Sequence, residues 1–365
     1  MNHILRQSRD AFAGALGDTV LWLAALMHLL VAISLAAVLF SVSPALAETP
    51  AFAQTKACSG HNLLTRLEAD DPAAYAKLRA EADQVENGKG IFWKIEKAGV
   101  APSYLLGTMH VTDPRVLAMP APARNAYAAA DTVVVESDEI ADAKKASALI
   151  LSRPDLAMFS DGRTITSLID KDDADRLAEG LKRRGVSLSA VSRMKPWMIA
   201  SFVALPACEL ARKASGASYL DQKLAQDALA SGKTLKGLET MLEQIEALNS
   251  LPLEPQIEGL IQTALLGDGI EDVIETMSQL YLAGETGMVI PMMRAAVPET
   301  TESGAGYADF EQRIIIDRNH RMAERAVPIL DGGNAFVAVG ALHLPGKEGL
   351  VALLQDRGFT LSRAD

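Results

Sequence analysis

Ser103-Tyr-Leu-Leu-Gly-Thr-Met-His110 is the stretch on which the predicted fold depends. Its apolar residues predict a strand, and a glycine and a histidine follow where that strand ends. Near the other end of the chain, Phe336-Val-Ala-Val-Gly-Ala-Leu-His343 repeats this order, a β-rich run closed by Gly-x-x-His. Ordinary packing does not require an imidazole in the loop after a strand. The two histidines are therefore either ligands of one shared site or separate structural histidines.

Further strands are predicted next to the first one. Residues 91–95 and 104–106 predict a hairpin, and residues 132–135, which follow an alanine-rich helical segment, predict a strand that ends in Glu136. A strand, a helical crossover and a second strand are the elements of a parallel βαβ unit, and ligands of such sheets bind beyond the carboxyl ends of the strands. We therefore expect His110 and Glu136 at one edge of the sheet.

The middle of the chain, residues 139–285, is predicted to be mostly helical because its apolar residues recur at helical spacing. One short strand is predicted within it, at residues 234–238, and leads to Glu239. A helix that carries Arg318 follows later in the chain. The predicted fold is a single α/β (α+β) domain, with a central mixed sheet formed by the N- and C-terminal parts and packed by the helical middle.

Four more elements complete the prediction near the two ends of the chain. Residues 61–86 read as a helix with an interruption at Asp70-Asp71-Pro72. Residues 335–339 predict the strand before His343, residues 347–356 a helix, and the surroundings of Phe359 a last short strand.

Composition excludes some classes of function. The chain is 49% hydrophobic and 22% charged, which suits a protein with a substantial core. Its net charge is −11, and no dense run of Lys and Arg offsets it. A general nucleic-acid binder or a binder of anionic membranes is therefore not expected.

The N-terminal segment predicts export. Residues 19–42 are almost wholly apolar and are followed by an A-x-A ending at residues 45–47, so residues 1–47 are predicted to be a signal peptide. The alternative is an uncleaved anchor, which would be the one contact with a membrane. Translation from Met27 would leave a signal of ordinary length. In each case the domain at 58–361 is expected in the periplasm or cell envelope.

Cys58 and Cys208 are the only cysteines of the chain. An even count in an exported protein favours a disulfide, which would join the start of the mature chain to a central helix. Two buried thiols are the alternative. A zinc site built on these cysteines is less favoured, because a structural site needs four ligands and neither cysteine has a second cysteine near it.

His110, His343 and Glu136 form a mixed nitrogen and oxygen set that suits Mn, Co or Zn rather than Ca. Such a metal lowers the pKa of bound water and polarises a carbonyl, while a carboxylate moves the proton, which is the chemistry of hydrolysis. The chain lacks H-E-x-x-H, G-x-S-x-G, a Walker A loop and a dinucleotide glycine fingerprint.

The charged candidates each have an ordinary structural interpretation as well. Glu136 is a metal ligand or general base, or else a solvated strand end. Glu239 is an additional catalytic acid, or else a carboxylate at the start of the helix after Thr240. Arg318 has five donors for a substrate carboxylate or an oxyanion, or else forms an ion pair with one of the many acids.

The chain contains an ordered set of motifs: Phe92-Trp-Lys, Gly107-Thr-Met-His110, Glu136, Gly237-Leu-Glu-Thr240, Arg318-Asn319 with Met322, and Gly340-Ala-Leu-His343 followed by Gly346. This set resembles the TraB/GumN family, to which the TIKI metalloproteases belong. The resemblance covers residues 58 to 361 and implies a metal-dependent peptidase or amidase that uses the two Gly-x-x-His motifs and a glutamate.

The same resemblance leaves other activities open. Its distant erythromycin-esterase-like members imply a metal-free hydrolase of esters or amides. Members that inhibit peptide pheromone signalling imply a non-catalytic protein that sequesters peptides. In each case the expected partner is a peptide or a small amide or ester.

Overall fold

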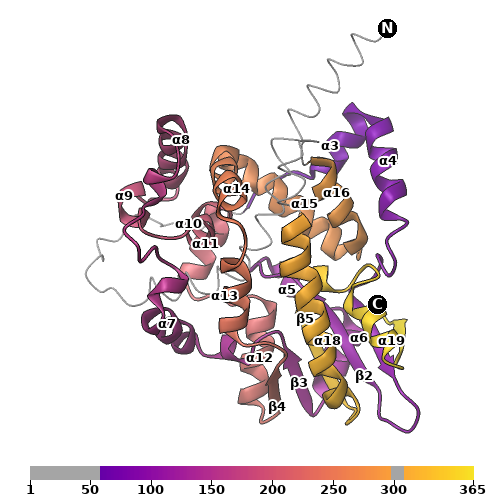
Figure 1. The fold of residues 1–365 in the computed structure, drawn as a ribbon. Helices are drawn as coiled ribbons and strands as arrows, with labels where there is room; N and C mark the ends of the chain where they lie inside the picture. Colours follow the sequence, from indigo (N-terminus) through magenta and orange to yellow (C-terminus); the bar gives the residue numbers. More distant parts are fainter. Residues whose placement is uncertain (1–57, 297–307) are drawn as a thin grey trace.

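The strands that precede the two Gly-x-x-His segments are neighbours in the computed structural model, which describes residues 58–296 and 308–365 (Figure 1). β2 (Ser103–Thr108) and β5 (Ala335–Gly340) are parallel, with Thr108 opposite Gly340. Because parallel neighbours end at the same edge of a sheet, the segments that follow them leave the sheet side by side. The predicted sheet of N- and C-terminal strands is confirmed.

Six strands form this mixed sheet among the described residues, in the order β4-β3-β5-β2-β1-β6. β1 (Phe92–Glu96) forms the predicted hairpin with β2, and β6 (Thr360–Arg363) lies antiparallel on the far side of β1. β3 (Thr132–Val135) and β4 (Thr234–Gly237) continue the parallel part beyond β5. The α/β class is confirmed, but β5 separates the two strands of the predicted βαβ unit.

β5 is buried on both faces, which explains why its sequence is apolar throughout. Phe336 and Ala338 belong to an apolar cluster with residues of α6 and α12, whereas Val337 and Val339 belong to one with residues of α18 and α19. The bounds of these helices are Ala121–Ala129 for α6, Leu220–Ala230 for α12, Asp317–Leu330 for α18 and Leu350–Asp356 for α19. Helices therefore cover the sheet on both sides.

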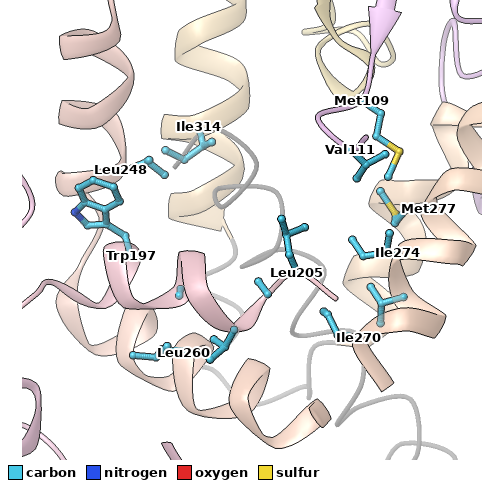
Figure 2. Close-up of a cluster of buried hydrophobic side chains, with 14 of the residues drawn as sticks. Met109, Val111, Trp197, Leu205, Leu248, Leu260, Ile270, Ile274, Met277 and Ile314 are labelled. Atoms are coloured by element: carbon cyan, nitrogen blue, oxygen red, sulfur yellow. The ribbon is translucent and has the colours of Figure 1, made fainter. Parts of the chain in front are cut away.

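The predicted helical middle of the chain forms a second core, which begins where β2 ends (Figure 2). Met109 and Val111 lie in it beside Ile274 and Met277 of α15. The helices of this region are α5 (Pro114–Leu117), α7 (Ala143–Ser152), α8 (Lys171–Lys182), α9 (Leu188–Val191), α10 (Pro196–Val203), α11 (Ala207–Ala214), α13 (Met241–Asn249), α14 (Leu253–Leu266), α15 (Ile270–Leu282) and α16 (Val289–Ala296). Burial of both neighbours of His110 holds that residue at the junction of the two cores.

Two predicted helices differ in extent from the observed ones. The helix predicted at 61–86 is divided at the predicted interruption into α3 (Leu63–Asp70) and α4 (Pro72–Ala82), because a proline begins the second and Asp71 caps it, and it ends at Ala82. The helix predicted at 347–356 begins only at α19, after a turn in which Gly346 has a φ of 89°.

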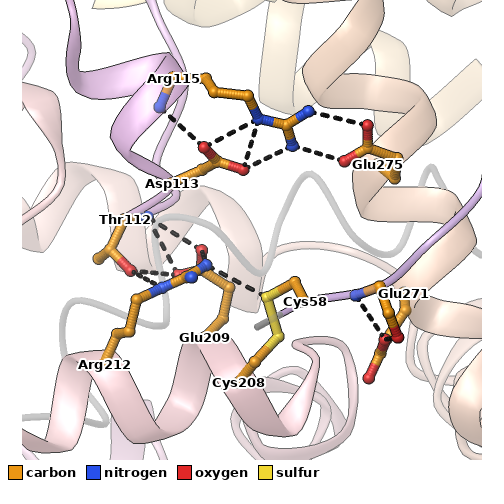
Figure 3. Close-up of a disulfide and its surroundings, with 10 residues drawn as sticks. Cys58, Thr112, Asp113, Arg115, Cys208, Glu209, Arg212, Glu271 and Glu275 are labelled. Atoms are coloured by element: carbon orange, nitrogen blue, oxygen red, sulfur yellow. Dashed lines mark hydrogen bonds and ion pairs between the residues drawn. A yellow bond between two sulfur atoms is a disulfide. The ribbon is translucent and has the colours of Figure 1, made fainter. Parts of the chain in front are cut away.

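The predicted disulfide is present between Cys58 and Cys208 of α11, with a Cα–Cα distance of 5.5 Å (Figure 3). Beside it, the buried Glu209 accepts hydrogen bonds from the backbone N–H and the hydroxyl of Thr112 and from Arg212. The disulfide thus adjoins a polar cluster that fixes the backbone two residues after His110.

The segment predicted as a signal peptide or anchor, residues 1–47, lies outside the described residues. Within the part of the chain that the structure describes, no helix is long and apolar enough to cross a bilayer.

Candidate active site

One cavity of about 80 Å³ lies where β2, β3 and β5 end. His110, Glu136, Arg318 and His343, four of the five predicted site residues, border it. The lining is completed by Thr108, Met109, Met277, Tyr281, Thr286, Val289, Ile314, Gly340, Ala341 and Leu342. The two distant Gly-x-x-His segments therefore border one site, as expected.

The glycine of each Gly-x-x-His segment is needed for close approach. A Cβ atom on Gly107 would lie 3.0 Å from the Cα of Ala341, in the turn that carries His343. A Cβ atom on Gly340 would lie 3.1 Å from Oε1 of Glu136. Larger residues at these positions would push the histidine turn away from β2 or from the carboxylate.

His343 is oriented by a hydrogen bond to its ring. Its Nδ1 lies 2.6 Å from the Oδ1 of Asn319 on α18, and its Nε2 lies 3.8 Å from the Oε1 of Glu136, beyond hydrogen-bond distance. Burial and then the neighbouring Arg318 cation lower the pKa of His343 to about 3. The ring is therefore neutral at physiological pH, with the proton on Nδ1 if the Asn319 oxygen accepts it.

His110 has a different oxygen partner. Its Nε2 lies 3.5 Å from Oδ2 of Asp221, and its Nδ1 is buried without a hydrogen-bond partner among the described residues. Burial lowers the pKa of His110, but the carboxylates of Asp221 and then Glu136 together outweigh burial, and the net pKa is raised. The ring of Tyr219 packs against the imidazole at 4.9 Å between centroids.

Glu136 is held on both carboxylate oxygens. Oε1 accepts from the backbone N–H of Gly340 at 2.7 Å, and Oε2 accepts from Arg318 at 2.6 Å and from Gln244 at 3.1 Å. Burial alone would raise the pKa of Glu136, but the Arg318 cation and the hydrogen bond from the Gly340 N–H lower it, so the pKa lies well below its usual range. Glu136 is therefore a fixed carboxylate rather than a solvated strand end.

Glu239 does not line the cavity but contacts Arg318, the partner of Glu136. It accepts from Nε of Arg318 and from Arg321, each at 2.8 Å, and its side chain is fully buried. The Arg318 Nη1 contact with the carbonyl of Ile314 is long, at 3.5 Å. The ion-pair interpretation of Arg318 therefore applies, with Nη1 as its least committed donor.

The ring nitrogens of His110 and His343 decide whether the site suits a divalent metal ion. Nε2 of His110 faces an oxygen of Asp221, and Nδ1 of His343 faces an oxygen of Asn319. The other nitrogen of His110 has no hydrogen-bond partner among the described residues, and the other nitrogen of His343 lies 3.8 Å from Glu136, beyond hydrogen-bond distance. Metal-binding histidines usually have such an oxygen partner on the second nitrogen. Among the described residues no group of three or more His, Cys, Asp or Glu surrounds a common metal position. The two imidazoles fit a divalent ion as donors, with the other ligands left to Glu136 or water.

Two residues of the site were not predicted from the sequence. Asp221 follows an unremarkable Tyr-Leu pair at the start of α12, and Gln244 lies inside an amphipathic helix, so neither carried a signal. Asn319 appeared only within the family motif. The remaining described histidines, His61 and His320, are exposed and contact Asp272 and Glu348 away from the cavity.

Comparison with known proteins gives the family. The model of the TraB/PrgY/gumN family matches residues 91–363. The chain belongs to this family. All the cavity-lining residues of this family member fall inside the matched range.

Several curated relatives are metalloproteases by name. Metalloprotease TIKI1 of Xenopus tropicalis is 25% identical over 339 residues, which cover 80% of this chain and 64% of the relative. Metalloprotease TIKI2 of Danio rerio is 25% identical over 71% of this chain and 57% of its own length, and Metalloprotease TIKI1 of Homo sapiens is 25% identical over 74% and 61%. The match thus spans about three-fifths of these relatives. No solved structure matches this TraB/PrgY/gumN family member.

Proposed function

We propose that this chain is an exported metal-dependent hydrolase of peptide or amide bonds. The observation that carries the proposal is that both Gly-x-x-His segments and Glu136 border one cavity. The names of the TIKI relatives support the metal dependence and the peptide substrate.

His110 and His343 would hold the ion, Mn, Co or Zn, with Glu136 as a further ligand or as the general base; when bound, the ion lowers the pKa of a water molecule and polarises a carbonyl. Asn319 keeps Nε2 of His343 directed to the Glu136 side of the cavity. Glu136 contributes Oε1, because Arg318 and Gln244 occupy Oε2. As a ligand or general base it would act from a position that the Gly340 N–H fixes.

Arg318 is proposed to bind a neutral carbonyl oxygen through Nη1. Its positive charge is balanced by Glu136 and Glu239, so a substrate carboxylate would find no free cation there. The rest of the wall is largely apolar and includes Met277, Val289 and Leu342. The substrate class that suits this cavity is an internal amide bond beside an apolar side chain, rather than a charged chain terminus.

Export rests on two features. The apolar segment at 19–42 with its A-x-A ending supports a cleaved signal, and the Cys58–Cys208 disulfide supports an oxidising compartment such as the periplasm. N-terminal sequencing of protein recovered from the cell envelope and from culture supernatant tests this part. A mature chain that keeps residues 1–47 would favour the anchor.

The activity is tested with internally quenched peptides that have blocked ends and an apolar residue at each position in turn. Turnover is expected to stop on chelation and to return with Mn²⁺, Co²⁺ or Zn²⁺. His110→Ala, His343→Ala and Glu136→Ala are each expected to lower the rate on the order of 10²-fold or more. His320→Ala is the matched control, because this imidazole is exposed and its partner is Glu348.

Turnover that survives both chelation and His343→Ala would refute the proposal. Turnover that survives chelation but is lost in the histidine variants would favour the metal-free, esterase-like alternative. Peptide binding without turnover in the wild type, unchanged by His110→Ala, would favour the sequestering protein.

A further inference from the structure

Asp221 is a buried acid that the proposed chemistry does not use. It is 1% exposed in the first turn of α12, and its Oδ1 accepts a hydrogen bond from the hydroxyl of Thr108 at 2.6 Å. Its Oδ2 has no hydrogen-bond partner among the described residues and lies 3.5 Å from Nε2 of His110. One carboxylate oxygen therefore faces the imidazole.

A purely structural role does not explain this placement. An acid near the N-terminus of a helix stabilises it only slightly, whereas burying a carboxylate costs much more free energy than that. The bond from Thr108 satisfies only one oxygen. A neutral side chain could accept that same bond without burying a charge, so the second oxygen requires its own explanation.

We propose that Asp221 is a positioning residue that holds His110 in the tautomer with its proton on Nε2. Nδ1 then keeps its lone pair, in agreement with the absence of a described partner for that atom. Only the catalytic consequence of this assignment rests on the proposed function; the tautomer itself does not.

The assignment makes the two histidines complementary. Asn319 faces Nδ1 of His343 and leaves Nε2 open, whereas Asp221 faces Nε2 of His110 and leaves Nδ1 open. Lys213 fixes the backbone of His110 by donating a hydrogen bond to its carbonyl at 3.2 Å. Each ring thus has one nitrogen committed to the protein and one left for a ligand or a proton.

The direct test is ¹⁵N NMR of the histidine rings in metal-free protein, at a pH above the pKa of His110 so that its ring is neutral. Comparison with His110→Gln assigns the signals. The wild type is expected to show a protonated Nε2 and a bare Nδ1 for His110. Asp221→Asn, which can still accept from Thr108 but can also donate to the ring, is expected to increase the population with the proton on Nδ1.

Asp227→Asn is the matched control, because this acid lies on the same helix, is exposed and pairs with Lys223. It is expected to leave the His110 signals unchanged. A wild-type ring with its proton on Nδ1, or an unchanged tautomer in a folded Asp221→Asn, would overturn the proposal. If Asp221→Asn does not fold, the wild-type spectrum decides.

The kinetic test compares the same variants with the quenched peptides. Asp221→Asn is expected to lower kcat on the order of 10²-fold with little change in KM, because it removes orientation and not substrate contacts. Asp221→Glu, which keeps the acceptor, is expected to recover part of the rate. A wild type without turnover would refute the hydrolase function while leaving the tautomer result to be judged alone.

Discussion

The guanidinium of Arg318 lies 2.6 Å from the Oε2 of Glu136. The same cation lies 2.8 Å from Glu239, so it balances two carboxylates inside the protein. This arrangement fixes the ionisation of Glu136 at the wall of the cavity, and it links β3, the end of β4 and α18 through charged groups.

Arg318→Met is expected to destabilise the fold by about 3–5 kcal/mol, because removing one partner of a buried pair leaves uncompensated charge. Urea unfolding measures the change. Arg321→Met is the matched control, since it pairs with the same Glu239 from a position that is 34% exposed. Its cost is expected to be smaller, and equal costs for the two variants would contradict the interpretation of the cluster.

Asn319→Ala is expected to lower turnover roughly 10-fold to 100-fold, because His343 loses the oxygen that orients its ring. Isothermal titration with Mn²⁺ or Zn²⁺ should show weaker binding by a similar factor. His320→Ala, on the next residue of the same helix, is expected to leave both quantities unchanged. An Asn319→Ala variant with wild-type metal affinity would show that His343 needs no such orientation.

The disulfide predicts that unfolded, unreduced protein contains no free thiol at Cys58 or Cys208. Cys58→Ser with Cys208→Ser is expected to lower the free energy of unfolding by roughly 2–4 kcal/mol, since the bond closes a long loop. Thiol titration and urea unfolding are the measurements. Two reactive thiols per chain in the exported protein would contradict the bond.

Stability is expected to depend on pH through Glu243, whose pKa is lowered from 4.5 to about 2, chiefly by hydrogen bonds from Arg325. The unfolded chain binds this proton at a higher pH than the folded protein does. The stabilisation is therefore complete above about pH 4.5 and is lost as the pH falls towards 2.

The matched variant is Glu243→Gln, which can still complete the capping box with Thr240. At pH 7 it is expected to be less stable than the wild type by no more than about 1 kcal/mol, because the Arg325 partner is partly exposed and solvent screens the pair. The difference should vanish near pH 2. A difference that stays constant with pH would assign the effect to something other than this ion pair.

The sheet could be predicted because its strands have local signals. The apolar runs at 104–106, 132–135 and 335–339 end in glycine, histidine or glutamate, and all three are strands in the structure. Their order in the sheet could not be predicted, because the insertion of β5 between β2 and β3 depends on contacts between segments far apart in sequence.

The site residues could likewise be predicted only where the sequence around them carries a local signal. Their residue types and positions indicated four residues, three near predicted strand ends and one on a predicted helix: His110, His343, Glu136 and Arg318. Asp221 and Gln244 are recognisable only from what their side chains face, Nε2 of His110 and Oε2 of Glu136. The spacing of residues along the chain does not indicate these two contacts.

The place of β5 has a consequence for the order in which the protein is made. Synthesis proceeds from the N-terminus, so β2 and β3 emerge long before their common neighbour at Ala335–Gly340. Until that last stretch arrives, the growing chain lacks the strand that joins the two halves of its sheet, and it also lacks His343. An incomplete chain therefore cannot assemble the cavity, and the proposed hydrolase would stay inactive while it is still being produced.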